Sequence, residues 1–147
     1  MIAIIALGML AMLACLALQV LASAFAARYF ARASKQPLGP RPWRRIFLQF
    51  SILLIMLMIG NIVQVAVWAA LYRMLGAFPD FETAMYFSGV TFTSLGYGDV
   101  VLDGRMRLLG PLQAGNGLMM FGITTALFIS AIQQTTAKWI AAQSART

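Results

Sequence analysis

The sequence lacks histidine altogether and has a single cysteine, Cys15, among its 147 residues. It therefore lacks the side chain most often used for acid–base chemistry and metal binding. A lone cysteine forms no disulfide within its own chain and no metal-binding pair, so we expect Cys15 to be a small packing residue. The chain has only four acidic residues, and they all lie between residues 73 and 107. No catalytic constellation is visible, and we expect neither an enzyme nor a cofactor.

Charge of either sign is scarce, because hydrophobic residues make up 61% of the chain and the mean hydropathy is +0.82. Three segments contain no Asp, Glu, Lys or Arg: residues 1–27, 46–72 and 108–137. Each segment exceeds the roughly 20 residues that a helix needs to cross a bilayer, and apolar helices in soluble cores are usually shorter. The first segment is longer than the apolar region of a signal peptide, and no basic residue precedes it. We predict three membrane-spanning helices.

The basic residues gather between the first two apolar segments. They are Arg28, Arg32, Lys35, Arg41, Arg44 and Arg45. Such a cluster favours a cytoplasmic loop, which places the N-terminus outside and the C-terminus inside, in a membrane that we expect to be the prokaryotic inner (plasma) membrane. The net charge of +7 then reflects topology and contacts with anionic lipid headgroups, so we expect membrane lipids as partners and no nucleic acid.

The chain divides into an N-terminal helix, a basic linker and a larger unit of two long helices with a short one between them. The predicted bounds are 1–32 for the first helix, 33–45 for the linker and 46–147 for the unit, with an outer helix over 46–75, a short helix over 81–93, a loop over 94–98 and an inner helix over 112–143. Asp80 is a candidate N-cap for the short helix. That helix is too short to span the bilayer, so it predicts a re-entrant element. Asn61 and Gln64 are polar side chains within the outer helix, and we expect them to face another helix.

The loop after the short helix is the most polar part of the apolar unit and reads TSLGYGD, Thr93–Asp99. Glycine adopts positive φ at little cost, so alternating glycines allow left- and right-handed conformations to alternate. Successive carbonyls can then point the same way, as a ladder of oxygens from residues 94–97. Such oxygens can replace the water shell of a monovalent cation. One chain supplies one ladder, so a ring requires several chains.

The inner helix has a stripe of residues at spacings of three and four, which places them on one face. They are Leu118, Phe121, Thr125, Ile129 and Gln133. The stripe becomes more polar toward its inner end, as a water-filled cavity would require. An ordinary packing face remains the alternative.

The motif TSLGYGD resembles the selectivity-filter signature of potassium channels, TTVGYGD, and residues 46–134 resemble the two-helix pore unit of that family. The resemblance implies an all-α membrane protein that forms a homotetrameric, potassium-selective channel. The first helix lies outside this unit, so we expect it at the periphery. The filter would comprise Ser94, Leu95, Gly96, Tyr97 and Gly98, with K+ held at the carbonyls of the first four.

The resemblance also implies supporting roles. Residues supporting the filter would be Thr93, Asp99, Tyr86 and Phe87. Gly117 and Gly122 would serve as hinge and close-packing glycines of the inner helix, and the stripe would line the cavity and gate. Two filter positions depart from the family, since Ser94 replaces Thr and Leu95 replaces Val. Two alternatives follow: a weakly selective cation channel, and a non-conducting accessory subunit of other channel chains.

Overall fold

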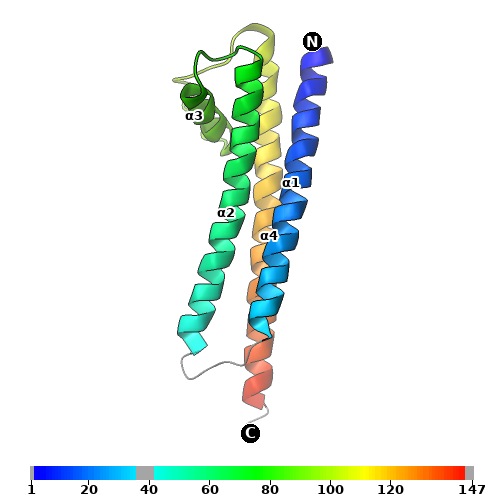
Figure 1. Cartoon of the computed structure of the whole chain (residues 1–147), viewed down its shortest axis with the longest axis vertical. Coiled ribbons are helices and arrows are strands. Elements are labelled where there is room, and N and C mark those ends of the chain that lie inside the picture. The colour runs from blue at the N-terminus through cyan, green and yellow to red at the C-terminus, as the bar shows by residue number, and fades with distance from the viewer. Residues whose placement is uncertain (1, 36–41, 145–147) are drawn as a thin grey trace.

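The computed structural model describes residues 2–35 and 42–144, and these residues form three long α-helices, one short α-helix and a 3₁₀ helix (Figure 1). The elements are α1 (Ile2–Ser34), α2 (Pro42–Met74), α3 (Phe81–Phe92), the 3₁₀ helix η1 (Gly104–Leu108) and α4 (Leu109–Ser144). Helices α1, α2 and α4 run lengthwise beside one another, and α3 lies against one end of α2. Within the described residues, three helical segments are long and apolar enough to cross a membrane: Ile2–Ser34, Pro42–Met74 and Gly104–Ala141.

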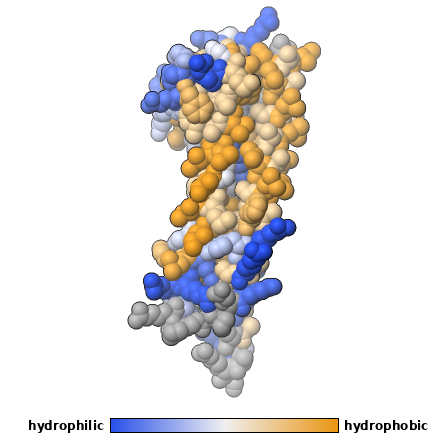
Figure 2. Space-filling view, in the orientation of Figure 1, coloured by the Kyte–Doolittle hydropathy of each residue, from blue (hydrophilic) through white to orange (hydrophobic). Residues whose placement is uncertain are grey.

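The surface carries a broad apolar band between two polar ends (Figure 2). Ile55 and Ile59 on α2, and Leu13 on α1, are among the large apolar side chains that remain more than half exposed. In water such a surface would drive aggregation, but in a bilayer the hydrocarbon core covers it. The band therefore belongs to a protein that spans the membrane.

Two helix starts differ from the sequence-based prediction. Helix α2 begins at Pro42 instead of residue 46, so Trp43, Arg44 and Arg45 are helical and do not belong to a linker. Proline suits the first position of a helix, because its φ is already helical and the missing N–H would have no partner there. Helix α4 begins at Leu109 instead of residue 112. Its first turn includes a proline for the same reason, and all four of its glycines are helical.

The other ends differ by one or two residues. Helix α1 continues to Ser34, two residues beyond the predicted end, so the predicted linker 33–45 was wrong at both ends. Helix α2 ends at Met74, α3 ends at Phe92 and α4 ends at Ser144. Such differences are common where the last turn of a helix frays or tightens.

Helix α1 is joined to the other two long helices by hydrogen bonds between side chains inside the bundle. Gln19 lies inside the three-helix bundle with 1% of its surface exposed. The Gln64 Nε2 amide donates to Gln19 Oε1 (2.6 Å), and Gln19 Nε2 donates to Thr124 Oγ1 (2.9 Å). Thr124 in turn donates to the Met120 carbonyl (2.9 Å). One chain of hydrogen bonds therefore joins α1, α2 and α4 at membrane depth, where polar partners favour helix association.

The same interface includes small residues that let the helices approach closely. A Cβ at Gly8 of α1 would lie 2.8 Å from Leu112 Cδ1 of α4, and a Cβ at Gly60 would lie 3.2 Å from Ala22. Cys15 is fully buried there, as expected of a packing residue. Asn61 is also buried, so both polar residues predicted to face another helix do so.

The two ends of the bundle differ in charge. The start of α1, helix α3 and the connection into α4 lie at one end, and the start of α2 and the end of α4 lie at the other (Figure 1). All four acidic residues of the chain belong to the α3 end. Arg32, Arg44, Arg45 and Lys138 lie at the opposite end.

Candidate functional site

Helix α3 is short because strong signals begin and end it. Asp80 caps its start: the carboxylate accepts hydrogen bonds from Thr83 N (2.7 Å) and Thr83 Oγ1 (2.9 Å). These bonds stabilise the charged form and hold the pKa of Asp80 below its usual range. Glu82 in the first turn adds a negative charge near the positive end of the helix. The cap predicted at Asp80 is confirmed.

The end of α3 forms a Schellman cap, which turns the chain directly into the glycine-bearing loop. Leu95 N donates to the Val90 carbonyl and Ser94 N donates to the Thr91 carbonyl, both at 3.0 Å. This pattern requires a left-handed residue just beyond the helix, a place usually taken by glycine. Here Ser94 occupies it, with φ of 60°. The first predicted filter residue is thus also the residue that ends the helix.

The loop backbone alternates in handedness as the sequence predicts. Ser94, Gly96 and Gly98 have φ of 60°, 56° and 79°, whereas Leu95 and Tyr97 between them do not have positive φ. Among the non-glycine residues that the structure describes, Ser94 alone has positive φ. A Cβ at Gly96 or Gly98 would meet no atom within 4 Å. The need for glycine at these two positions therefore comes from the backbone and not from neighbouring atoms.

One hydrogen bond ties the far end of the loop to α3. The Tyr86 hydroxyl donates to Asp99 Oδ2 at 2.6 Å. It lowers the pKa of Asp99 from its ordinary value of 3.8 and raises the pKa of Tyr86 from its ordinary value of 10.0. At neutral pH the pair is therefore a protonated phenol and a charged carboxylate. Since Tyr86 lies on α3 and Asp99 follows the loop, the bond closes the loop across its two ends.

A buried polar network holds the other side of α3. Tyr72 OH donates to Gln113 Oε1 (2.6 Å), and Gln113 Nε2 donates to Ser88 Oγ (2.6 Å) and to the Ser88 carbonyl (3.1 Å). Ser88 Oγ donates to the Val65 carbonyl (2.7 Å). The network joins α2, α3 and α4, so it fixes the helix that carries the loop. Sequence reasoning missed it, because Gln113 and Ser88 follow no recognisable spacing.

The predicted supporting residues lie in different places. Phe87 is buried beside Tyr72 and Phe78, with ring centroids 5.2 and 5.1 Å away, in an aromatic cluster against α2. It is Tyr86, the adjacent residue, that bonds Asp99. Thr93 is the C-cap of α3, and its hydroxyl donates to the carbonyl of Gly89 (2.8 Å).

The two glycines of the predicted hinge also differ. A Cβ at Gly117 would lie 1.9 Å from the Phe92 carbonyl oxygen, whereas one at Gly122 would meet nothing within 4 Å. Gly117 thus permits the close approach of α4 to the end of α3, and any larger residue would push the two helices apart.

Four of the five stripe residues of α4 are exposed in the single chain. Leu118 and Ile129 are 62% and 48% exposed, and Thr125 and Gln133 are exposed as well. Phe121 is partly buried, because its ring packs against Phe92 of α3 with centroids 5.5 Å apart. The stripe and the loop are both left open by the chain's own fold.

The fold and this loop define a class of protein: an all-helical membrane protein in which a short helix and an irregular loop stand between two spanning helices. Residues 60–134, slightly more than half of the chain, match the model of a family described as ion channel. The chain belongs to this family. No curated protein and no solved structure shows significant similarity to it. The matched region begins within α2 and ends within α4, so α1 lies outside it.

Proposed function

We propose that the chain forms a potassium-selective channel of four identical subunits, through which K+ passes down its gradient. The observation that supports it best is the alternation of positive φ at Ser94, Gly96 and Gly98 within the sequence SLGYG. Alternating handedness turns successive carbonyls to one side. The oxygens of Ser94, Leu95, Gly96 and Tyr97 would then replace the hydration shell of a K+ ion, as carbonyl rings do in such filters.

Surfaces left open in one chain support the tetramer. Carbonyl coordination of a cation requires oxygens from all sides, which one loop cannot supply. A closed ring of identical subunits supplies them by symmetry. The exposed stripe of Leu118, Thr125, Ile129 and Gln133 would line the cavity beneath the filter, because it lies on the inner helix and mixes apolar with polar side chains.

The charge distribution supports an orientation. Under the positive-inside rule, the end that carries Arg32, Arg44, Arg45 and Lys138 would face the cytoplasm. The N-terminus and the loop would then face outside. Asp99 would place a negative charge at the outer mouth, where it attracts cations.

The test is a bi-ionic reversal potential, measured on purified protein in a planar bilayer with K+ on one side and Na+ on the other. We expect a potential close to the limit for a membrane permeable to K+ alone. A measurable current that reverses near zero would instead identify a weakly selective cation channel, and Ser94 and Leu95 would be the residues to examine. Protein that forms no stable homotetramer and carries no current would identify an accessory subunit.

A further inference from the structure

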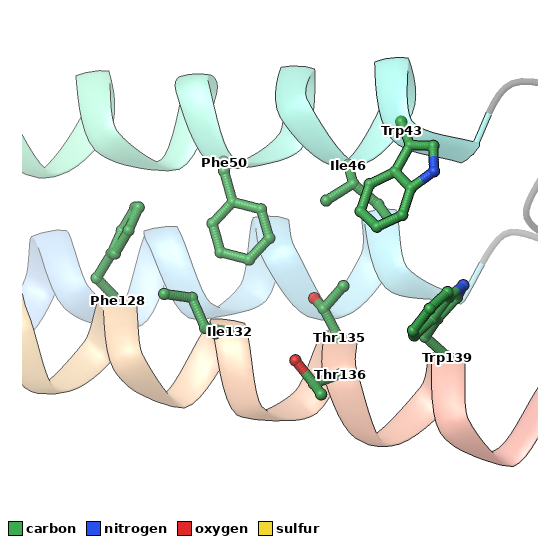
Figure 3. Close-up of a pocket in the computed structure, with 8 residues that line it drawn as sticks. All are labelled: Trp43, Ile46, Phe50, Phe128, Ile132, Thr135, Thr136 and Trp139. Carbon is green, nitrogen blue, oxygen red and sulfur yellow. The ribbon is translucent and has the colours of Figure 1, made fainter.

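An apolar cleft of about 330 Å³ separates the start of α2 from the end of α4 (Figure 3). Its lining residues are Trp43, Ile46, Phe50, Phe128, Ile132, Thr135, Thr136 and Trp139. The rings of Phe50 and Phe128 close its deep end, with centroids 5.4 Å apart. The rings of Trp43 and Trp139 stand at its outer end, 5.8 Å apart. Figure 3 shows these side chains facing one another across the gap between the two helices.

The chain leaves this apolar surface unfilled. Trp43 is 67% exposed, Ile132 is 45% exposed and Trp139 is 39% exposed. Tryptophan favours the boundary between headgroups and hydrocarbon in membrane proteins. The cleft therefore runs from headgroup level, at the two indoles, into the apolar layer, at Phe50 and Phe128. The long axis of the cleft therefore follows the membrane normal, which is also the direction of a lipid acyl chain.

The headgroup end of the cleft is basic. A second hollow shares Ile46, Thr135 and Trp139 with the cleft and adds Lys138 and Arg45. The Lys138 ammonium is exposed and donates to the Ser34 carbonyl at 3.3 Å, which leaves it two further protons to donate. The four acidic residues of the chain belong to the opposite end of the bundle. The cleft thus joins an apolar slot to an uncompensated positive charge.

We propose that this cleft binds one anionic phospholipid from the leaflet on its side of the membrane. One acyl chain would lie between α2 and α4, from the indoles to Phe50 and Phe128. The phosphate would lie beside Lys138, because the Thr135 hydroxyl at the border already donates its proton to the Ala131 carbonyl (3.0 Å). A second copy of the chain suits the cleft less well, because it would bring the same basic residues to this end and no acid to pair with them.

A lipid at this place would contact the part of α4 that carries the proposed gate. Phe128 and Ile132 each precede a stripe residue, Ile129 and Gln133, by one position, so they lie on the adjacent face of α4. An acyl chain between α2 and α4 would hold these helices at a set separation, so it would bias the position of the inner end of α4. The binding itself does not depend on which ion the pore conducts.

The test is native mass spectrometry of the delipidated full-length assembly. The protein in detergent is titrated with phosphatidylglycerol and, separately, with phosphatidylcholine bearing the same acyl chains. We expect one phosphatidylglycerol per chain to bind at low concentration. We expect phosphatidylcholine to bind at least about fivefold more weakly, because a basic side chain near the headgroup favours the anionic lipid by about that factor. Equal affinity for the two lipids would overturn the proposal.

Two pairs of variants locate the site. Ile132→Trp fills the cleft, and Ile59→Trp makes the same change on the exposed surface of α2, where the wild-type side chain is 55% exposed. Lys138→Gln removes the charge beside the cleft, and Lys35→Gln removes a charge at the same end of the bundle. We expect the first member of each pair to lower phosphatidylglycerol affinity about fivefold or more, and the second to leave it unchanged.

Three further outcomes would overturn the proposal. The first is that the matched variants Ile59→Trp and Lys35→Gln weaken binding as much as their partners, which would indicate a general surface effect. The second is that Lys138→Gln keeps full affinity for the anionic lipid. The third is that no lipid binds tightly to the wild type, which would mean that a neighbouring copy of the chain covers the cleft.

Discussion

Gly96 and Gly98 show how the proposed function would depend on single backbone angles. Both have positive φ, and neither would place a methyl group against any atom within 4 Å. A substitution there changes the conformational preference and little else. The left-handed region disfavours residues with a Cβ by about 1–2 kcal/mol. In the proposed filter, that is enough to shift a loop whose four carbonyls would have to align.

We therefore expect Gly98→Ala to abolish K+ flux into proteoliposomes while the assembly keeps its size on gel filtration. Gly104→Ala is the matched control, because Gly104 also has positive φ (55°) and equally free space but lies outside the loop. It should lose a similar amount of stability, about 1 kcal/mol, and keep its flux. Wild-type flux in Gly98→Ala would contradict the carbonyl ladder.

The Tyr86–Asp99 bond gives the loop a dependence on pH whose direction is fixed. The pKa of Asp99 is lowered from 3.8, so the bond stabilises the loop above pH 3.8 and its contribution is lost as the pH falls through the lowered pKa. The pKa of Tyr86 is raised from 10.0, so the contribution is present below pH 10.0 and is lost as the pH rises through the raised pKa. The bond therefore spans the neutral range.

Tyr86→Phe removes the donor and allows the pKa of Asp99 to return toward 3.8. We expect the acid midpoint of flux loss to move upward in this variant, and sustained flux at neutral pH to decline faster. Flux into proteoliposomes measured against external pH reports both effects. Tyr29→Phe, at the opposite end of the bundle, is the control. An unchanged acid midpoint would show that the bond does not hold the conducting loop.

At the scale of elements, the sequence predicts best where local signals are strong. Helix α3 lies within one residue of its predicted bounds, because Asp80 caps its start and the loop residues end it. The starts of α2 and α4 were predicted too late. The predicted start of α2 is the first residue of its charge-free segment, whereas the helix begins at Pro42, and α4 begins at Leu109 and includes Pro111. Proline is excluded from helix interiors partly because it has no N–H to bond the preceding turn. In the first turn no backbone N–H has a carbonyl of the helix to bond, so proline is tolerated there.

Partners across helices were harder to predict. The sequence indicates that Gln64 must face a helix, since an amide in lipid needs a partner. It does not reveal that the partner is Gln19, because 45 positions separate them and nothing local relates the two. Ser94 shows the same limit: its left-handed conformation follows from the hydrogen bonds that cap α3, which no motif records.

Gln19→Leu tests whether the hydrogen-bonded chain holds α1 to the pore unit. The change keeps the size of the side chain but leaves the Gln64 amide without its acceptor. We expect a loss of about 1–2 kcal/mol in stability, the upper range for hydrogen bonds between membrane helices. Unfolding of the purified protein by denaturing detergent measures it.

The double variant Gln19→Leu with Gln64→Leu should recover part of the loss, because both polar partners are then gone. Gln134→Leu is the control, since this exposed amide bonds only to Ser130 on its own helix. A Gln19→Leu protein as stable as the wild type would show that apolar packing alone holds α1.

At the scale of the whole molecule, the exposed stripe of α4 and the exposed loop are the surfaces that the proposed tetramer would bury or line with water. A cysteine at Thr125, in a Cys15→Ser background, distinguishes these outcomes. We expect a charged, water-soluble thiol reagent applied from the cytoplasmic side to modify it and block K+ current. Ile59→Cys, on the exposed apolar surface, should remain unreactive. An inert Thr125→Cys in channels that conduct would mean that the stripe is a packing face.

The bond between Gln19 and Thr124 joins residues 105 positions apart. A ribosome adds about 5–20 residues per second, so Thr124 emerges roughly 5–20 s after Gln19 has been made. Gln64 can donate to Gln19 Oε1 once α2 has been made, but until α4 follows, Gln19 Nε2 has no native acceptor in the apolar core, which is unfavourable. We expect α1 of chains arrested before α4 to cross-link to the insertion machinery, and that of full-length chains to be released. The time at which α1 leaves the insertion machinery would then depend on Gln19, whose Nε2 gains its acceptor only after the last helix has been made.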